Sequence, residues 1–181
     1  SLVAGVIGTS FVPYYKELAP VLKQIVVTKT RKDERKLRGK AFECLSLMGL
    51  SVGRNIFAQD AQEAMQAMME TASRGLEPDD PQRSYIHEAA QRICRSLKDQ
   101  FCPYLPYLLP GIYSQLQMQP VEVVDHDPED AEQDMTLDFL SDGKVVGLKT
   151  SQIEDFQCAV QLLSCFLEVL GSDFFDHIQD A

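Results

Sequence analysis

The chain of 181 residues lacks the side-chain arrangements on which most enzymes depend. It has three histidines, His87, His126 and His177, and none lies in an H-E-x-x-H motif or at a cysteine–histidine zinc spacing. The sequences G-x-x-x-x-G-K and G-x-G-x-x-G are also absent, and the G-x-S-x-G match at 49–53, GLSVG, ends a helical stretch and does not follow a strand, so it is not a nucleophile elbow. His87 lies beside Glu88, but the sequence offers it no catalytic partner. We therefore expect a binding protein without catalytic residues, metal or cofactor.

Long apolar runs are missing as well. No segment approaches the ~20 apolar residues that cross a bilayer, and the chain does not open with a basic and apolar leader. We expect neither secretion nor membrane insertion. The cysteines form no C-x-x-C pair and lie among apolar residues, so we expect reduced, mostly buried thiols in a cytosolic or nuclear protein. They are Cys44, Cys94, Cys102, Cys158 and Cys165.

Basic side chains are scarcer than acidic ones, 17 against 27, and the net charge is -10. Phosphate binding needs clustered lysine and arginine, so this balance argues against nucleic acid as the main partner and is compatible with basic partners. Between Lys98 and Lys144 there is no lysine or arginine. The one basic run, 28–40, reads TKTRKDERKLRGK. It is either an exposed loop and helix start balanced by Asp33 and Glu34, or a site for an acidic partner or nucleic acid.

Three similar segments begin at Phe11, Phe57 and Phe101, at intervals of about 45 residues. They read FVPYYKELAPVLKQIV, FAQDAQEAMQAMMETA and FCPYLPYLLPGIYSQL, and another helical stretch precedes each of them. A helix pair of this period is typical of HEAT and armadillo repeats, and we expect the aromatic positions to pack between stacked repeats. The opening SLVAGVIGTSF resembles SLMGLSVGRNIF, so we expect a first helix that is cut short in an excised fragment.

Local signals support helices. Apolar residues recur every three or four positions in 37–48 and in 86–97. Asp80, followed by a proline, suits an N-cap, and Ser151, with a glutamate three residues later, fits a capping box. Gly75 is a plausible stop for the helix before it.

The prolines also fit a helical repeat. We expect Pro103 in the first turn of a helix, where its missing N–H is harmless. Pro20, Pro106 and Pro110 should bend or locally break their helices, which favours a curved architecture.

One segment departs from the repeat pattern. Residues 121–134 read VEVVDHDPEDAEQD and lead into TLDFLSDGKVVGLKT, where Asp142-Gly143 predicts a two-residue hairpin loop. The acidic stretch is either a solvated loop, a negatively charged segment that attracts lysine- and arginine-rich partners, or an internal segment that competes for such partners. Its candidate residues are Glu122, Asp125, Asp127, Glu129, Asp130, Glu132 and Asp134.

We therefore predict an all-α, right-handed superhelix of about four HEAT-type helix pairs, with an acidic loop and a short β-hairpin inserted. The predicted units are a partial repeat at 1–28, repeats at 29–75 and 76–118, the insertion at 119–150, and a further repeat at 151–181.

In such a solenoid the second helices of successive pairs line one concave surface. Asp60, Glu63 and Glu70 fall on one side of a helix and could meet a lysine-bearing extended peptide, although ordinary solvated helix faces would show the same pattern. Tyr15 and Tyr107 are candidates for exposure on this surface. The full set of binding candidates is Glu17, Gln24, Asp60, Glu63, Gln66, Glu70 and Gln115.

Several segments carry a family resemblance. FVPYYKELAPVLKQIV, LRGKAFECLSLMGLSVGRNIFAQDAQEAM, DDPQRSYIHEAAQRICRSLKDQFCPYLPYLLPGI and DFLSDGKVVGLKTS resemble the middle of importin-beta (karyopherin-beta) family nuclear transport receptors. The resemblance implies tandem HEAT repeats that bind nuclear localisation signals, Ran in its GTP form and phenylalanine-glycine nucleoporins. It further implies basic cargo such as ribosomal proteins and histones, and residence in the cytoplasm, the nucleus and the nuclear pore. The alternative is a HEAT scaffold subunit that assembles folded partners.

Overall fold

The computed structural model describes residues 8–77, 80–117, 121–123, 135–139 and 145–178. The opening residues of the expected truncated first helix lie outside these ranges, before the short 3-10 helix η1. The elements in chain order are η1 (Gly8–Phe11), α2 (Val12–Thr28), η2 (Lys32–Glu34), α3 (Arg35–Val52), α4 (Arg54–Ser73), α5 (Gln82–Leu97), η3 (Lys98–Tyr104), α6 (Leu105–Leu116), β1 (Val121–Val123), β2 (Met135–Phe139), β3 (Val145–Lys149), α7 (Thr150–Leu170) and α8 (Ser172–Ile178).

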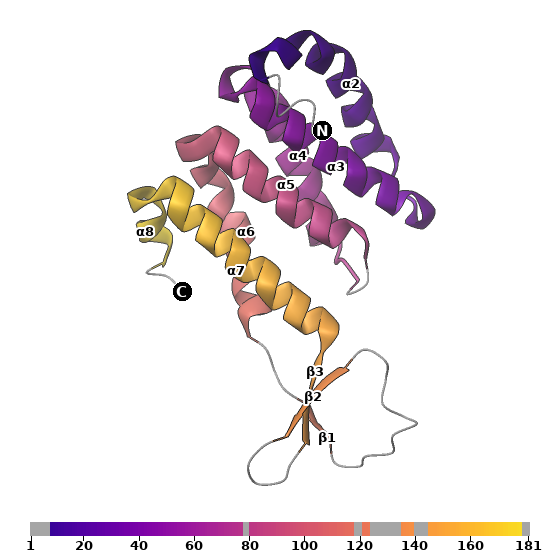
Figure 1. Cartoon of the computed structure of the whole chain (residues 1–181), viewed down its shortest axis with the longest axis vertical. Coiled ribbons are helices and arrows are strands. Elements are labelled where there is room, and N and C mark those ends of the chain that lie inside the picture. Colours follow the sequence, from indigo (N-terminus) through magenta and orange to yellow (C-terminus); the bar gives the residue numbers. More distant parts are fainter. Residues whose placement is uncertain (1–7, 78–79, 118–120, 124–134, 140–144, 179–181) are drawn as a thin grey trace.

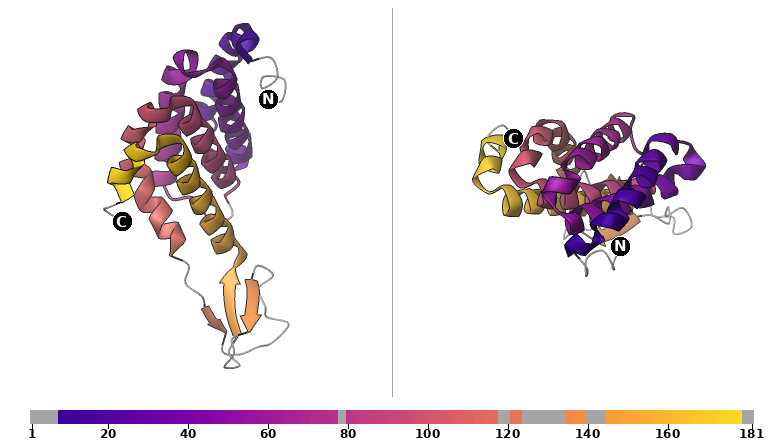
Figure 2. Two further views of the ribbon diagram at one scale, coloured as in Figure 1. Left: turned by 60° about the vertical axis from the view of Figure 1, so that its left-hand side comes forward. Right: turned by 90° about the horizontal axis from the view of Figure 1, so that it is seen from above.

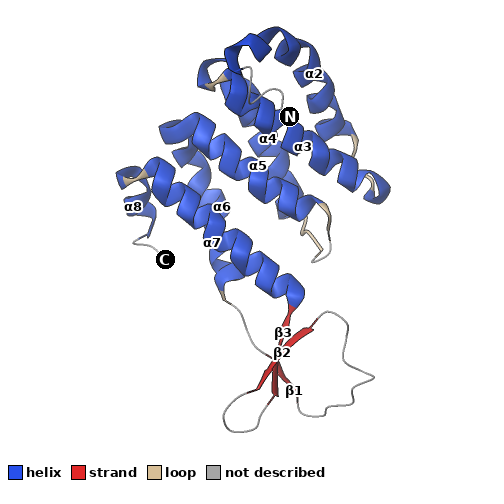
Figure 3. Ribbon diagram, in the orientation of Figure 1, coloured by secondary structure: helices blue, strands red, loops and turns tan. Residues whose placement is uncertain are grey.

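The helices form two layers. Helices α3, α5 and α7 lie side by side in one layer, while α2 packs on α3 and α4, and α6 packs on α7 (Figure 1). Figure 3 shows that the strands are confined to the end of the molecule beyond the helices. The prediction of stacked antiparallel helix pairs is confirmed, and the boundaries of the individual repeats stay a prediction. No helix within the described ranges is long and apolar enough to cross a membrane.

Two of the helix pairs are joined by single-residue turns, whereas η3 joins α5 to α6. Only Gly53 separates α3 from α4, and only Gly171 separates α7 from α8, and both have positive φ (81° and 55°). A residue with a Cβ rarely adopts this conformation, so glycine allows the abrupt reversal. Helix α4 ends at Ser73, close to the predicted stop at Gly75.

The start of α5 follows the prediction, with a shift of one residue. Asp80 is buried, and its Oδ1 accepts a hydrogen bond of 2.9 Å from the backbone N–H of Gln82, the first residue of the helix. The capping box at Ser151 is wrong, because α7 begins at Thr150, directly after β3, so that Ser151 lies inside the helix.

The positions of the prolines differ in part from the prediction. Pro103 lies near the end of the 3-10 helix η3, so the prediction that it occupies the first turn of a helix is wrong. Pro106 lies in the first turn of α6, where no helical hydrogen bond is lost, so the expectation that it bends a helix is also wrong. Pro20 and Pro110 lie inside α2 and α6, and the bends expected there stay a prediction.

The core is built from the repeated aromatic positions. Phe57 and Phe101 are fully buried and Phe11 is nearly so, which confirms that they are packing residues. Gly49 in α3 makes room for Phe57: a Cβ on Gly49 would lie 2.4 Å from the ring. The cysteines are free, with Cys94 and Cys165 buried and the other three half-buried.

The inserted strands form a sheet of order β1-β3-β2, in which both pairs are antiparallel. The predicted hairpin is confirmed as β2 and β3, with Phe139 opposite Val145, while Asp142-Gly143 lies outside the described residues. Strand β1 was not predicted; it adds to the free edge of β3. The sheet projects from the N-terminal end of α7 (Figure 2).

Most of the basic run at 28–40 is paired with nearby acids. Lys29 Nζ lies 2.8 Å from Glu34 Oε1, and Arg35 Nη1 lies 2.9 Å from the buried carboxylate of Asp80. Glu34 provides part of the balance as predicted, whereas Asp80, rather than Asp33, pairs with Arg35.

The expectation that the basic run is exposed is wrong for Arg38, whose side chain is buried at 6% exposure. Its Nε donates to the Val26 carbonyl at 2.6 Å, and its Nη1 donates to Thr71 Oγ1 and to Gln82 Oε1. One guanidinium group thus joins α2, α3, α4 and α5.

Candidate functional site

The exposed sides of α2 and α4 together carry a group of polar side chains that we call the α2–α4 surface. Apolar residues of α4, from Phe57 to Met68, occupy the buried side of that helix, so the 3.6-residue period turns the polar ones outward. The α2–α4 surface consists of Lys23 from α2 and Gln59, Asp60, Glu63, Gln66 and Glu70 from α4.

Asp60 is the innermost carboxylate of this surface, and two groups from α2 hold it. Its Oδ2 accepts a hydrogen bond from the Tyr15 hydroxyl, and its Oδ1 lies 2.6 Å from Lys23 Nζ. Tyr15 is itself buried with its ring edge-on to Phe57. Burial, followed by the bond to Asp60, raises the pKa of Tyr15, so its hydroxyl keeps the proton that it donates. Tyr15 therefore fixes the orientation of the Asp60 carboxylate.

Lys23 lies between two carboxylates. Its Nζ is 2.6 Å from Asp60 Oδ1 and 2.9 Å from Glu63 Oε2. The side chains of Lys23, Asp60 and Glu63 are 28%, 16% and 48% exposed. Hydrogen bonds to Asp60 and then Glu63 raise the pKa of Lys23, so the ammonium is retained throughout the neutral range.

The remaining polar residues of α4 extend the surface along the helix. Gln59 Nε2 donates to Glu63 Oε1 at 3.4 Å, and Gln66 Nε2 donates to Glu70 Oε1 at 3.1 Å. Glu70 is exposed and forms no ion pair with any residue in the described ranges. Asp60, Glu63 and Glu70 thus lie along one side of α4, as their spacing predicted.

Glu17 and Gln24 are exposed on α2, seven residues apart and on the side of the helix opposite its buried residues. They do not contact the carboxylates of α4. Tyr107 is 74% exposed as expected, whereas the prediction of an exposed Tyr15 is wrong, because its ring fills the space between α2 and α4.

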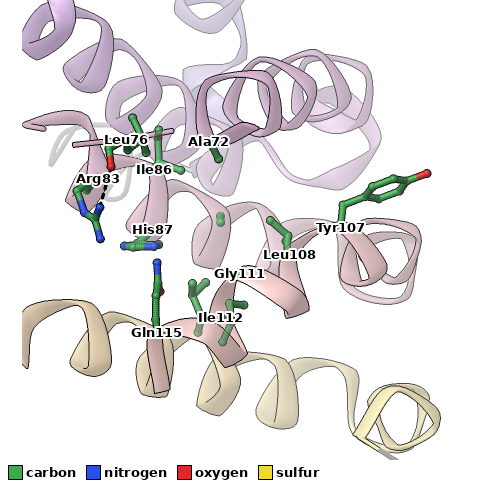
Figure 4. A pocket seen from close by; sticks show the side chains of 12 residues that line it. Ala72, Leu76, Arg83, Ile86, His87, Tyr107, Leu108, Gly111, Ile112 and Gln115 are labelled. Carbon is green, nitrogen blue, oxygen red and sulfur yellow. Dashed lines mark hydrogen bonds between the residues drawn. The ribbon is translucent and has the colours of Figure 1, made fainter. Parts of the chain in front are cut away.

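Gln115 is the binding candidate that the structure places apart from the others. Its side chain is half-buried in α6 and points toward His87 of α5 (Figure 4). Of the acidic-insert candidates, Glu122 lies in β1 opposite Val146. The others lie outside the described residues: Asp125, Asp127, Glu129, Asp130, Glu132 and Asp134.

A cavity of about 250 Å³ opens between α5 and α6, beside the C-terminal end of α4 (Figure 4). Ile86, Leu108, Ile112 and Leu162 make its lining mostly apolar, and Tyr107 stands at one end. A volume of this size accepts one large side chain rather than a cofactor. Its apolar walls would favour an aliphatic or aromatic group.

The polar end of the cavity holds His87, Gln115 and Arg83. His87 Nδ1 and Gln115 Oε1 are buried and find no hydrogen-bond partner among the residues that the structure describes. Burial, together with the nearby Arg83 cation, lowers the pKa of His87, which is therefore neutral at pH 7. Arg83 bonds to Asp155 and to the Leu76 carbonyl, and so holds its place beside the imidazole.

Nothing in this arrangement forms a metal centre: within the described ranges, no three His, Cys, Asp or Glu side chains gather so as to hold an ion. Sequence reasoning missed Lys23 and the cavity. Lys23 could have been found from the repeat period, which places α2 beside α4, because it lies on the side of α2 that adjoins α4. The cavity had no such signal, because its lining comes from four helices.

The stacked helix pairs define a class of protein, an α-helical solenoid of the HEAT type, and the α2–α4 surface adds a polar row along α4. Solved structures of Kap121p bound to Pho4p and to Nup53p superpose with TM-scores of 0.80 and 0.81 at 26% sequence identity. Each match covers 98% of this chain and 17% of the other. No family model matches the sequence.

Curated relatives agree with the solved structures. The chain is 28% identical over 183 residues to importin subunit beta-3 of Saccharomyces cerevisiae, and 28% identical over 179 residues to the probable importin-5 homolog of Dictyostelium discoideum. Each match covers 99% of this chain but only 17% or 16% of the relative. The resemblance to a segment of importin-beta family receptors, in the branch of importin-5 and importin subunit beta-3, is confirmed.

Proposed function

We propose that this chain is part of the cargo-binding surface of a nuclear import receptor and that it binds extended, lysine- and arginine-rich segments along the α2–α4 surface. The observation that carries the proposal is the ammonium of Lys23, which Asp60 and Glu63 hold at 2.6 and 2.9 Å. Two carboxylates from one helix thus already bind a lysine head group in the geometry that a cargo lysine would need.

The relatives support a role in protein binding. Kap121p has been solved in complex with Pho4p, with Ste12p and with Nup53p, and the yeast relative is named importin subunit beta-3. We extend this to a receptor that carries basic cargo, including ribosomal proteins and histones, between cytoplasm and nucleus. Contact with phenylalanine-glycine nucleoporins and release by Ran-GTP belong to the same proposal for the full-length receptor, and no catalytic step is part of it.

Charge explains why α4 suits such a partner. Glu63 and Glu70 are exposed and seven residues apart, so they lie about two turns from each other along α4, roughly 10 Å at 1.5 Å per residue. A polyproline II chain has three residues per turn and advances about 3.1 Å per residue, so lysines three residues apart would face the same side and reach both carboxylates. The net charge of -10 adds a long-range attraction for basic segments.

The test is a charge reversal with a matched control. Glu63→Lys/Glu70→Lys should weaken the binding of a fluorescein-labelled peptide, with lysines three residues apart, about tenfold or more, and the affinity of the unaltered chain should fall as salt rises. Glu154→Lys/Glu168→Lys makes the same change in net charge on exposed positions of α7, in the other layer, and should have a much smaller effect. Equal losses in both double variants, or binding that ignores salt, would refute the proposal and favour a scaffold that holds folded partners.

A further inference from the structure

Lys23 reaches across from a different helix to the place where a cargo lysine would bind. It belongs to α2, whereas Asp60 and Glu63 belong to α4, and its ammonium contacts both carboxylates. The pair of acids with Lys23 carries a net charge of one negative unit, and the same pair without Lys23 would carry two. An incoming ammonium therefore meets a site that is already filled and half neutralised.

We propose that Lys23 is an intramolecular competitor that occupies the Asp60–Glu63 pair and must be displaced when a basic peptide binds. This inference rests on the proposed function, and it adds a residue that sets which peptides can bind. Because Lys23 is tethered beside the carboxylates, its effective concentration there is high, on the order of millimolar. A peptide with one lysine competes poorly against it, whereas a peptide with several lysines gains contacts at Glu70 as well.

The contacts allow this exchange. Lys23 and Glu63 are both partly exposed, so the ammonium can move into water, and a partly exposed ion pair such as Lys23–Glu63 is weak; Asp60, 16% exposed, is the more buried of the two acids. Asp60 stays in place when Lys23 leaves, since the Tyr15 hydroxyl holds its other oxygen. The acid pair therefore remains organised for the ammonium that replaces Lys23.

A purely structural role for Lys23 makes a different prediction. If Lys23 only ties α2 to α4, its removal lowers stability and leaves peptide affinity unchanged or weaker. If it competes, its removal raises the affinity, and the gain depends on Glu63.

The experiment compares Lys23→Met with Lys16→Met. Lys16 is exposed on the same helix, two turns away, and forms no ion pair within the part of the chain that the structure describes, so its removal changes the net charge equally. The probes are two fluorescein-labelled glycine-serine peptides, one with a single lysine and one with four, titrated at low and physiological salt. We expect Lys23→Met to bind the single-lysine peptide about two- to fivefold more tightly than the unaltered chain, with little gain for Lys16→Met.

Two further variants decide the outcome. Lys23→Met/Glu63→Gln should lose the gain, and Lys23→Gln serves as a second variant if the methionine variant fails to fold by circular dichroism. Equal gains for the Lys16 and Lys23 variants would overturn the inference in favour of a general charge effect, while the proposed function would stand. Weaker binding by a folded Lys23 variant would overturn it too. If no form of the chain binds either peptide, the proposed function fails and the inference with it.

Discussion

Arg38 makes the sharpest prediction about stability, because a single charged group connects four helices. Replacing it with methionine keeps the unbranched side chain but removes the hydrogen bonds to the Val26 carbonyl, Thr71 Oγ1 and Gln82 Oε1. It also removes the contact of the guanidinium with the Phe42 ring, whose centroid lies 5.3 Å from the guanidinium carbon.

The expected loss follows from these contacts. A hydrogen bond to a charged group is worth about 1.5–3 kcal/mol, and a buried acceptor left alone costs about 1–3 kcal/mol. The variant also avoids the cost of burying a cation, a cost that is visible in the pKa of Arg38, which burial lowers. Thr71 keeps a bond of 2.6 Å to the Ala67 carbonyl. We expect a net loss of about 2–4 kcal/mol in the free energy of unfolding.

Urea unfolding followed by circular dichroism measures this loss. Lys36→Met is the control, because Lys36 lies two residues earlier on α3 and is exposed, and its replacement should change the free energy of unfolding by no more than about 0.5 kcal/mol. Arg38→Lys should fall between the two, since an ammonium cannot reach all three acceptors. If Arg38→Met and Lys36→Met differ by less than about 1 kcal/mol, the reasoning from the hydrogen bonds is wrong.

Two further predictions concern packing and pH. Gly49→Ala should destabilise the chain by about 1–3 kcal/mol, because the new Cβ would overlap the Phe57 ring. Gly111→Ala, whose Cβ would meet open space, should be neutral or stabilise the chain by up to about 1 kcal/mol. Melting temperatures of the two variants test this difference. Folding lowers the pKa of His87, so as pH drops from 7.5 through about 6.5 the imidazole takes up a proton more readily in the unfolded chain than in the folded one. The free energy of unfolding should therefore fall, by at most about 1.4 kcal/mol per pH unit. His87→Gln should show a shallower fall between pH 7.5 and 5.5, and parallel curves would contradict the assignment.

Local sequence patterns predicted most of the helical architecture. The period of the apolar residues placed the helices, and the recurring Phe11, Phe57 and Phe101 marked the contacts between pairs, because burial requires a fixed spacing on each helix. Asp80 was identified as a cap from its position before a proline. These features depend on neighbours in the sequence.

What the sequence could not predict depends on distant segments that meet in space. Arg38 looks like one more charge in a basic run, and only the convergence of α2, α4 and α5 on α3 buries it. The bond from Tyr15 to Asp60 likewise needs the exact stacking of α2 on α4. Strand β1 is three residues long, too short for an alternating pattern, and exists by pairing with β3.

The cavity beside α6 has a mechanical consequence. Its lining comes from three consecutive helix pairs, since Ala72 lies at the end of α4, Ile112 belongs to α6 and Leu162 belongs to α7. Any rotation of one of these pairs against the next must widen or narrow the cavity, and such rotations add up along a solenoid. A side chain bound in this cavity would hold the neighbouring pairs apart, so that occupancy of the cavity would change the pitch of the superhelix at this point.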